Sequence, residues 1–164
     1  MPAYRIQNRC LDNGLTVVTI AMPHLHSAQI YLYARAGSRH ESPKNNGLSH
    51  FIEHMFFRGC QGFPTSTALN AAIEDLGGVF DGFTSRDTSS YHASVHPSFC
   101  ADAISIMGRM FLKSTFRDLE IERGIILEEM LDAVDERGRM MDLDSIAHRE
   151  AFADHPLGMP IEGT

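Results

Sequence analysis

Short stretches in which apolar residues dominate or alternate with polar ones mark the strands of this chain. Asp12-Asn13-Gly14 separates two of them and is typical of a tight turn between antiparallel strands. Near the middle of the chain, Arg86-Asp87 lies between two more, and we expect these two side chains to form an ion pair within that turn. The predicted strands span residues 5–11, 15–22, 27–36, 79–85 and 89–96.

Between and after these strands the apolar residues recur with the period of a helix. Capping residues at Thr65-Ser66-Thr67 and stop signals at Gly59 and Gly77-Gly78 support the boundaries of the first two helices. The predicted helices span residues 48–57, 65–76, 98–112, 118–136 and 143–153. Strands in hairpin-like pairs mixed with helices predict an α+β fold, a mostly antiparallel sheet with helices packed on one face.

Composition narrows the class of protein. The 164 residues are 43% apolar and 21% charged, with a net charge of −7, which fits one globular domain spanning 1–164. The sequence contains no basic stripe of the kind that binds nucleic acid. It also contains no apolar run long enough to span a membrane. Because the first residues lack the apolar stretch of a signal peptide, we expect a cytoplasmic protein. The chain ends without a terminating element, so we expect it to be the N-terminal portion of a longer domain.

Three cysteines, at positions 10, 60 and 100, are too far apart to form a Cys-x-x-Cys pair. Their odd number fits a reducing compartment. We expect each of them to be a small buried apolar side chain.

The segment His50-Phe51-Ile52-Glu53-His54 carries the main chemical signal. Residues four apart on a helix share a face, so His50 and His54 can direct their imidazoles at one metal ion, and imidazole suits zinc. Glu53 lies at the edge of that face, within reach of a water molecule bound to the metal. The alternative is an amphipathic helix that carries two exposed histidines without a metal.

Catalytic zinc commonly has three protein ligands, so a third must come from elsewhere. In the predicted helix 118–136, Glu122 and Glu129 are seven residues apart and share a face with Ile125 and Ile126. Burying a carboxylate along an apolar stripe is unfavourable in free energy unless the carboxylate is paired or bound to a metal. Glu129 is therefore a candidate ligand, the alternative being a surface acid beside a basic residue.

The stretch from Gly47 to Gly59 strongly resembles the pitrilysin and mitochondrial processing peptidase family, the M16 or inverzincin zinc metallopeptidases. Other matching segments follow in the same order along almost the whole chain. They are Asn13-Gly14-Leu15, Arg35 to Arg39, Gly77-Gly78, Phe83 to Asp87 with Tyr91, Glu122 to Met130, His155 to Gly158 and Gly163-Thr164.

The resemblance implies one zinc ion per chain, held by His50, His54 and Glu129, with Glu53 as general base and Glu122 supporting the site from outside the ligand set. It implies a zinc-dependent endopeptidase that hydrolyses extended peptides or unfolded protein segments and adds them to a sheet edge, residues 79–85. A second homologous domain or subunit is the expected partner. The alternative is a catalytically incomplete or partner-requiring chain that binds zinc without turnover. Asp81-Gly82 departs from the Asn-Ala that the family usually carries.

Overall fold

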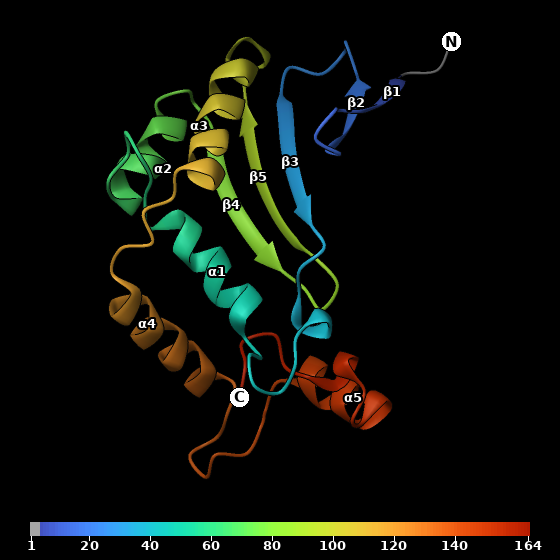
Figure 1. Cartoon of the computed structure of the whole chain (residues 1–164), viewed down its shortest axis with the longest axis vertical. Helices are drawn as coiled ribbons and strands as arrows, with labels where there is room; N and C mark the ends of the chain where they lie inside the picture. The colour runs from blue at the N-terminus through green and yellow to red at the C-terminus, as the bar shows by residue number, and fades with distance from the viewer. Residues whose placement is uncertain (1–3) are drawn as a thin grey trace.

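The computed structural model describes residues 4–164, and its centre is a three-stranded antiparallel sheet (Figure 1). The strands are β3 (Ala28–Ala34), β4 (Val79–Thr84) and β5 (Ser89–Val95), in the order β3-β5-β4. Tyr91 of β5 is opposite Leu32 of β3 and Gly82 of β4. β5 is therefore the central strand, and β4 lies at an edge of the sheet.

Three helices cover one face of this sheet: α1 (Leu48–Phe57), α2 (Ser66–Glu74) and α3 (Cys100–Leu112) (Figure 1). Alternate residues of β5 point to the helices and are buried, as the alternating pattern predicts. Thr65 caps α2 by accepting a hydrogen bond from the Ala68 amide at 3.1 Å. The core contains Cys60, Leu69, Ile73, Tyr91, Ala93, Val95, Ala103, Met107 and Met110.

The first two strands, β1 (Arg5–Cys10) and β2 (Thr16–Ala21), pair with each other and form a separate two-stranded sheet. Gly14 in their turn has a φ of +86°, a conformation that glycine adopts without steric cost. Both strands are exposed along their whole length in the described residues. The predicted hairpin is thus present but lies apart from the larger sheet (Figure 1).

The second half of the chain adds α4 (Leu119–Asp132) and α5 (Leu143–Phe152) below the sheet, with α4 beside α1 (Figure 1). Three 3-10 turns complete the described elements: Ser38–His40, Pro97–Phe99 and Pro156–Gly158. The predicted helix 118–136 is too long at its C-terminal end. The carboxylate of Asp135 accepts hydrogen bonds from the amides of Arg137 and Arg139, so a turn replaces the last helical residues.

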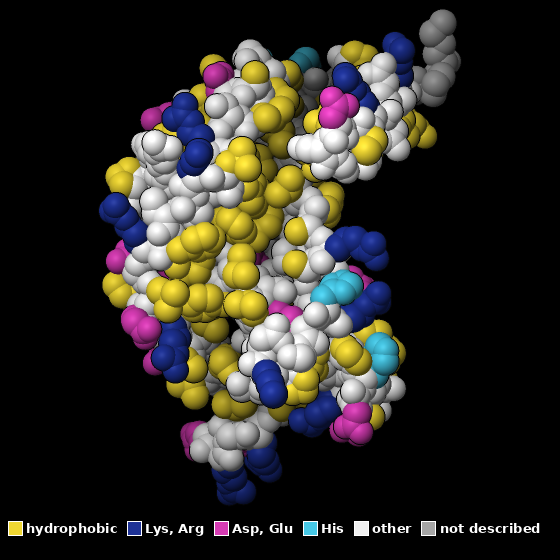
Figure 2. Space-filling view, viewed as in Figure 1, with side chains coloured by type: hydrophobic (Ala, Val, Ile, Leu, Met, Phe, Trp, Pro, Cys, Tyr) yellow, Lys and Arg dark blue, Asp and Glu magenta, His cyan; other side chains and the backbone are white. Residues whose placement is uncertain are grey.

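Hydrophobic side chains gather over the middle of the face seen in Figure 2, where Figure 1 places the helices. Exposed large apolar residues on α1, α3 and α4 include Leu48, Ile52, Ile104, Leu112, Leu119, Ile121, Ile125, Leu127 and Leu131. Within the described residues, no helix combines the length and the hydropathy that crossing a bilayer requires.

Candidate metal centre

The position of α1 is fixed at its N-terminus by a carboxylate and a glycine. Glu41 accepts hydrogen bonds from the backbone amides of Gly47 and Ser49, at 2.8 and 2.6 Å, which satisfies amides that the helix leaves unpaired. Gly47 has a φ of +90°, and a Cβ there would lie 2.6 Å from the Glu162 carbonyl oxygen. This close contact holds the first turn of α1, which carries His50, against the C-terminal segment.

His50 and His54 project from α1 toward α4 and meet Glu129 there. Their Nε2 atoms lie 3.2 Å apart. A carboxylate oxygen of Glu129 lies 3.7 Å from His54 Nε2 and 4.0 Å from His50 Nε2. The three side chains thus each offer one ligand atom, all within 4.8 Å of one another. The two imidazoles are mostly buried, whereas the Glu129 side chain is 43% exposed.

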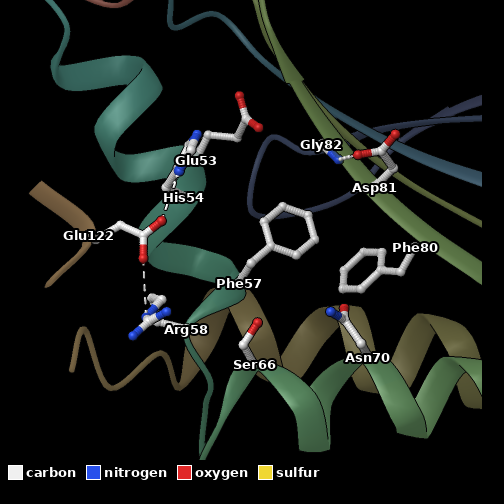
Figure 3. Close-up of a pocket in the computed structure, with 10 residues that line it drawn as sticks. All are labelled: Glu53, His54, Phe57, Arg58, Ser66, Asn70, Phe80, Asp81, Gly82 and Glu122. Atoms are coloured by element: carbon white, nitrogen blue, oxygen red, sulfur yellow. Dashed lines mark hydrogen bonds and ion pairs between the residues drawn. The ribbon is translucent and has the colours of Figure 1, made fainter. Parts of the chain in front are cut away.

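Glu122 lies behind this cluster, between His54 and Arg58 (Figure 3). It is 5% exposed, with one carboxylate oxygen 2.8 Å from His54 Nδ1 and the other 3.2 Å from Arg58 Nε. Since an ionised carboxylate only accepts hydrogen bonds, His54 Nδ1 must carry the proton. In the neutral imidazole the lone pair is then on Nε2, the atom that faces His50 and Glu129.

Glu53 points to the other side of α1, toward β4. It is 9% exposed and accepts a hydrogen bond of 2.5 Å from the hydroxyl of Thr84. Gly82 permits this close packing, because a Cβ there would lie 2.7 Å from the Phe57 ring and 3.0 Å from the Glu53 carboxylate. The helix and the edge strand therefore hold the Glu53 side chain in one orientation.

A cavity of about 310 Å³ opens between α1, α2 and β4, and Glu53 and His54 both line it (Figure 3). The Phe57 and Phe80 rings form an apolar wall, while α2 contributes Ser66 and Asn70. The cavity is thus lined by polar groups at both ends, with the two aromatic rings between them.

Tyr91 of β5 lies in the core that the helices cover, near Glu53. Tyr91 packs edge-to-face against Phe56 and Phe111. Its pKa is raised above the ordinary tyrosine value, chiefly because it is buried and in addition because the Glu53 carboxylate is near. Tyr91 therefore stays a neutral phenol at physiological pH.

The donor set suits a zinc ion. Tetrahedral zinc with ligand bonds of about 2.1 Å separates its ligand atoms by about 3.4 Å. The observed separations of 3.2, 3.7 and 4.0 Å lie close to that value. Two imidazoles and one carboxylate would leave a fourth position for water, and the approach of the two Nε2 atoms to 3.2 Å is an arrangement that a shared cation stabilises.

Of the five residues singled out in the sequence, the structure clusters His50, His54 and Glu129 and places Glu122 against His54. Glu53 lies on the other side of α1 and shares the cavity lining with His54 and Glu122. The expectation that both carboxylates of α4 lie along an apolar stripe is correct only for Glu122. Ile126 is buried beside it, but Ile125 is 40% exposed.

The sequence reasoning did not single out three residues that position the site: Arg58, Thr84 and Glu41. Arg58 could have been noticed because it lies four residues after His54, on the same helix face. Thr84 and Glu41 carry no comparable signal, since their roles depend on contacts across the fold.

The chain matches the family model of insulinase, peptidase family M16, over residues 16–164. It belongs to peptidase family M16. An uncharacterized zinc protease of Rickettsia bellii is 37% identical over 158 residues, which cover 94% of this chain and 37% of that protein. The mitochondrial-processing peptidase subunit beta of Blastocladiella emersonii is 35% identical over 155 residues, 93% of this chain and 33% of the relative. The family resemblance seen in the sequence is thereby confirmed.

Solved structures confirm the M16 fold and the expected α+β class. A protease from Helicobacter pylori superposes with a TM-score of 0.87 at 19% identity, over 99% of this chain and 39% of that one. Pitrilysin superposes with a TM-score of 0.79 at 20% identity, over 98% of this chain and 17% of that one. The chain spans about a third of the length of the curated relatives it matches, 37% and 33% for the two named above.

Proposed function

We propose that this M16 chain is the zinc-binding part of an endopeptidase that cleaves extended peptides or unfolded protein segments. The observation that carries the proposal is the meeting of His50, His54 and Glu129 beside the cavity that Glu53 lines. The names of the relatives, zinc protease and mitochondrial-processing peptidase, support the same activity. One zinc ion per chain would be held by the two imidazoles and the Glu129 carboxylate.

When bound, zinc would acidify a water molecule and polarise the peptide carbonyl. The remaining work falls to residues of the chain. Glu53 accepts the proton of the attacking water on its free carboxylate oxygen, and later delivers it to the nitrogen of the leaving amine. Thr84 holds the other oxygen and so fixes the direction of the base. Glu122 keeps the proton on His54 Nδ1, which directs the Nε2 lone pair to the metal.

The substrate in this proposal binds as an added strand at the edge of the sheet. β4 is an edge strand, and it also forms one wall of the cavity beside Glu53. A peptide paired with β4 would thus pass within reach of the base. Because main-chain pairing demands little of the sequence, extended and unfolded segments are the fitting substrate class.

Replacement of Glu53 by Gln tests the proposal. The variant keeps the shape and the hydrogen bond from Thr84 but cannot accept a proton. We expect cleavage of a mixed quenched-fluorescence peptide library to be lost while zinc content stays at the wild-type value. Glu128→Gln, an exposed carboxylate on α4, is the matched control and should cleave normally. Retained cleavage in Glu53→Gln would defeat the assignment of the base.

The second candidate is a partner-requiring chain that binds zinc without turnover by itself. The observation in its favour is that the chain spans only 37% and 33% of the two relatives named above. A second homologous domain or subunit would then close the site. Zinc binding without cleavage, followed by cleavage once the partner is added, would select this candidate.

A further inference from the structure

The free edge of β4 offers a limited set of backbone groups. The turn between β4 and β5 closes with the Ser85 amide donating to the Thr88 carbonyl, at 2.8 Å. Pairs that exchange hydrogen bonds alternate with pairs that do not in an antiparallel ladder. From this register Phe80, Gly82 and Thr84 belong to the second kind, so their amides and carbonyls point away from β5. These groups are the ones that an added strand would use.

Gly82, the middle one of the three, is already engaged. Its amide donates to the carboxylate of Asp81, the preceding residue, at 2.8 Å (Figure 3). The Asp81 side chain thus leans over the edge and occupies the place that a substrate carbonyl oxygen would take. An incoming strand must displace this carboxylate to pair with Gly82.

The displaced carboxylate has no basic side chain to receive it. Within residues 4–164, no Lys, Arg or His nitrogen lies within 4.0 Å of the Asp81 carboxylate. Asp81 is exposed and also lines the cavity. Its cross-strand neighbour is His92 of the central strand β5. A negative charge therefore lies at the rim of the edge where the substrate strand is expected.

We propose that Asp81 is a specificity-determining residue that selects substrates with Lys or Arg at the position paired with it across the substrate strand. The inference rests on the proposed function, because it assumes that peptides bind along β4. Directly opposed side chains of opposite charge attract across a strand pair, and like charges repel. A basic side chain also draws the carboxylate off the Gly82 amide and frees that amide for the substrate backbone. An acidic side chain at the same position leaves the carboxylate over the edge.

The test uses a neutral peptide with a single cleavage point, in sets that carry Lys, Gln or Glu at each position in turn. For wild type we expect kcat/KM at one position to be about two- to thirtyfold higher with Lys than with Glu. This range combines the attraction of Lys to Asp81 with the repulsion of Glu by Asp81. Because side chains of a strand alternate between faces, the positions directly before and after should show no preference. The preference should fall as salt rises.

Two substitutions separate the charge from the hydrogen bond. Asp81→Asn keeps an oxygen that can accept from the Gly82 amide, and it should abolish the preference of Lys over Glu. Asp81→Ala removes both features, so it should abolish the preference and also lower KM for the Gln peptide. The same peptides are measured by fluorescence anisotropy on the Glu53→Gln variant, which gives a binding readout without turnover.

The outcomes are distinguishable. A charge preference in wild type that disappears in Asp81→Asn supports the inference. Peptides that bind and are cleaved without any charge preference, or with a preference that survives in Asp81→Asn, overturn it and leave the proposed function intact. Asp81 would then only block pairing between edge strands of different molecules. If no peptide binds or is cleaved, the proposed function fails and this inference fails with it.

Discussion

Glu122 on α4 lies 2.8 Å from Nδ1 of His54 on α1, although 68 residues separate them along the chain. This contact orients a candidate zinc ligand, and the Arg58 guanidinium lies 3.2 Å from the other oxygen of the buried Glu122 carboxylate. The candidate site therefore depends on the docking of α4 against α1 as much as on the two histidines of α1.

Replacing Glu122 by Gln should weaken zinc binding by about ten- to a hundredfold, the usual effect of removing an outer partner of a ligating histidine. The amide removes the charge that pairs with both His54 and Arg58. Zinc affinity measured by competition with a chromogenic chelator gives the result. Glu120→Gln is the control, since that side chain is 80% exposed on the same helix. Equal affinity in both variants would show that Glu122 does not support the metal.

Much of the fold could be predicted from the sequence, because it depends on local patterns. The alternation of Ile30, Leu32 and Ala34 with more polar neighbours predicted β3, and its residues are alternately partly buried and exposed. Asp12-Asn13-Gly14 predicted the first hairpin in the same way. In the site, the spacing of two histidines and a glutamate on a helix indicated a metal site, and the family resemblance supplied the role of each residue.

Contacts between distant segments could not be predicted. The expected ion pair between Arg86 and Asp87 is wrong: Arg86 contacts Asp144 of α5 at 2.6 Å, and Asp87 contacts Arg39 at 2.7 Å. Adjacent residues in a turn point in different directions, so each finds a partner from another element. For the same reason no pattern in the sequence indicated that Glu122 is buried and Glu129 partly exposed.

Gly82→Ala should impair catalysis more than metal binding. The new methyl group would meet the Phe57 ring at 2.7 Å and the Glu53 carboxylate at 3.0 Å, so the base must shift. Because misplacement of a reacting group by about 1 Å can cost a hundredfold in rate, we expect kcat to fall about ten- to hundredfold. Zinc content should stay unchanged, since neither contact involves His50, His54 or Glu129.

Gly108→Ala is the matched control for the loss of kcat expected in Gly82→Ala. Gly108 in α3 has no atom within 4 Å of the position of its added Cβ. Gly108→Ala should therefore stabilise the protein by about 0.5–1 kcal/mol through helix propensity, with unchanged cleavage. Equal kcat in Gly82→Ala and Gly108→Ala would contradict the packing described for the edge strand.

Glu41→Ala should loosen the start of α1. It removes a carboxylate that accepts hydrogen bonds from the Gly47 and Ser49 amides, and we expect a loss of about 1–3 kcal/mol in the free energy of unfolding. Urea unfolding measures the change, with the exposed Lys44→Ala in the same loop as control. A midpoint equal to that of the control would mean that the cap does not hold the helix.

The cysteines should differ sharply in reactivity. The expectation that all three are buried is correct for Cys60, which is 1% exposed. It is wrong for Cys10, which is exposed, and for Cys100, which is only partly buried. Burial raises the pKa of the Cys60 thiol, so at neutral pH less thiolate is present to react. Alkylation followed by mass spectrometry should modify Cys10 first and Cys60 only on unfolding. Early modification of Cys60 would contradict the core described here.

The central claim is that His50, His54 and Glu129 hold one zinc ion, and metal analysis tests it most directly. Purified wild-type chain, loaded with zinc and dialysed, should retain one ion per chain. Glu129→Ala should bind zinc at least about tenfold more weakly, whereas Glu128→Ala, the exposed neighbour on α4, should match wild type. Wild-type protein that retains no zinc, or equal affinity in Glu129→Ala and Glu128→Ala, would contradict the account.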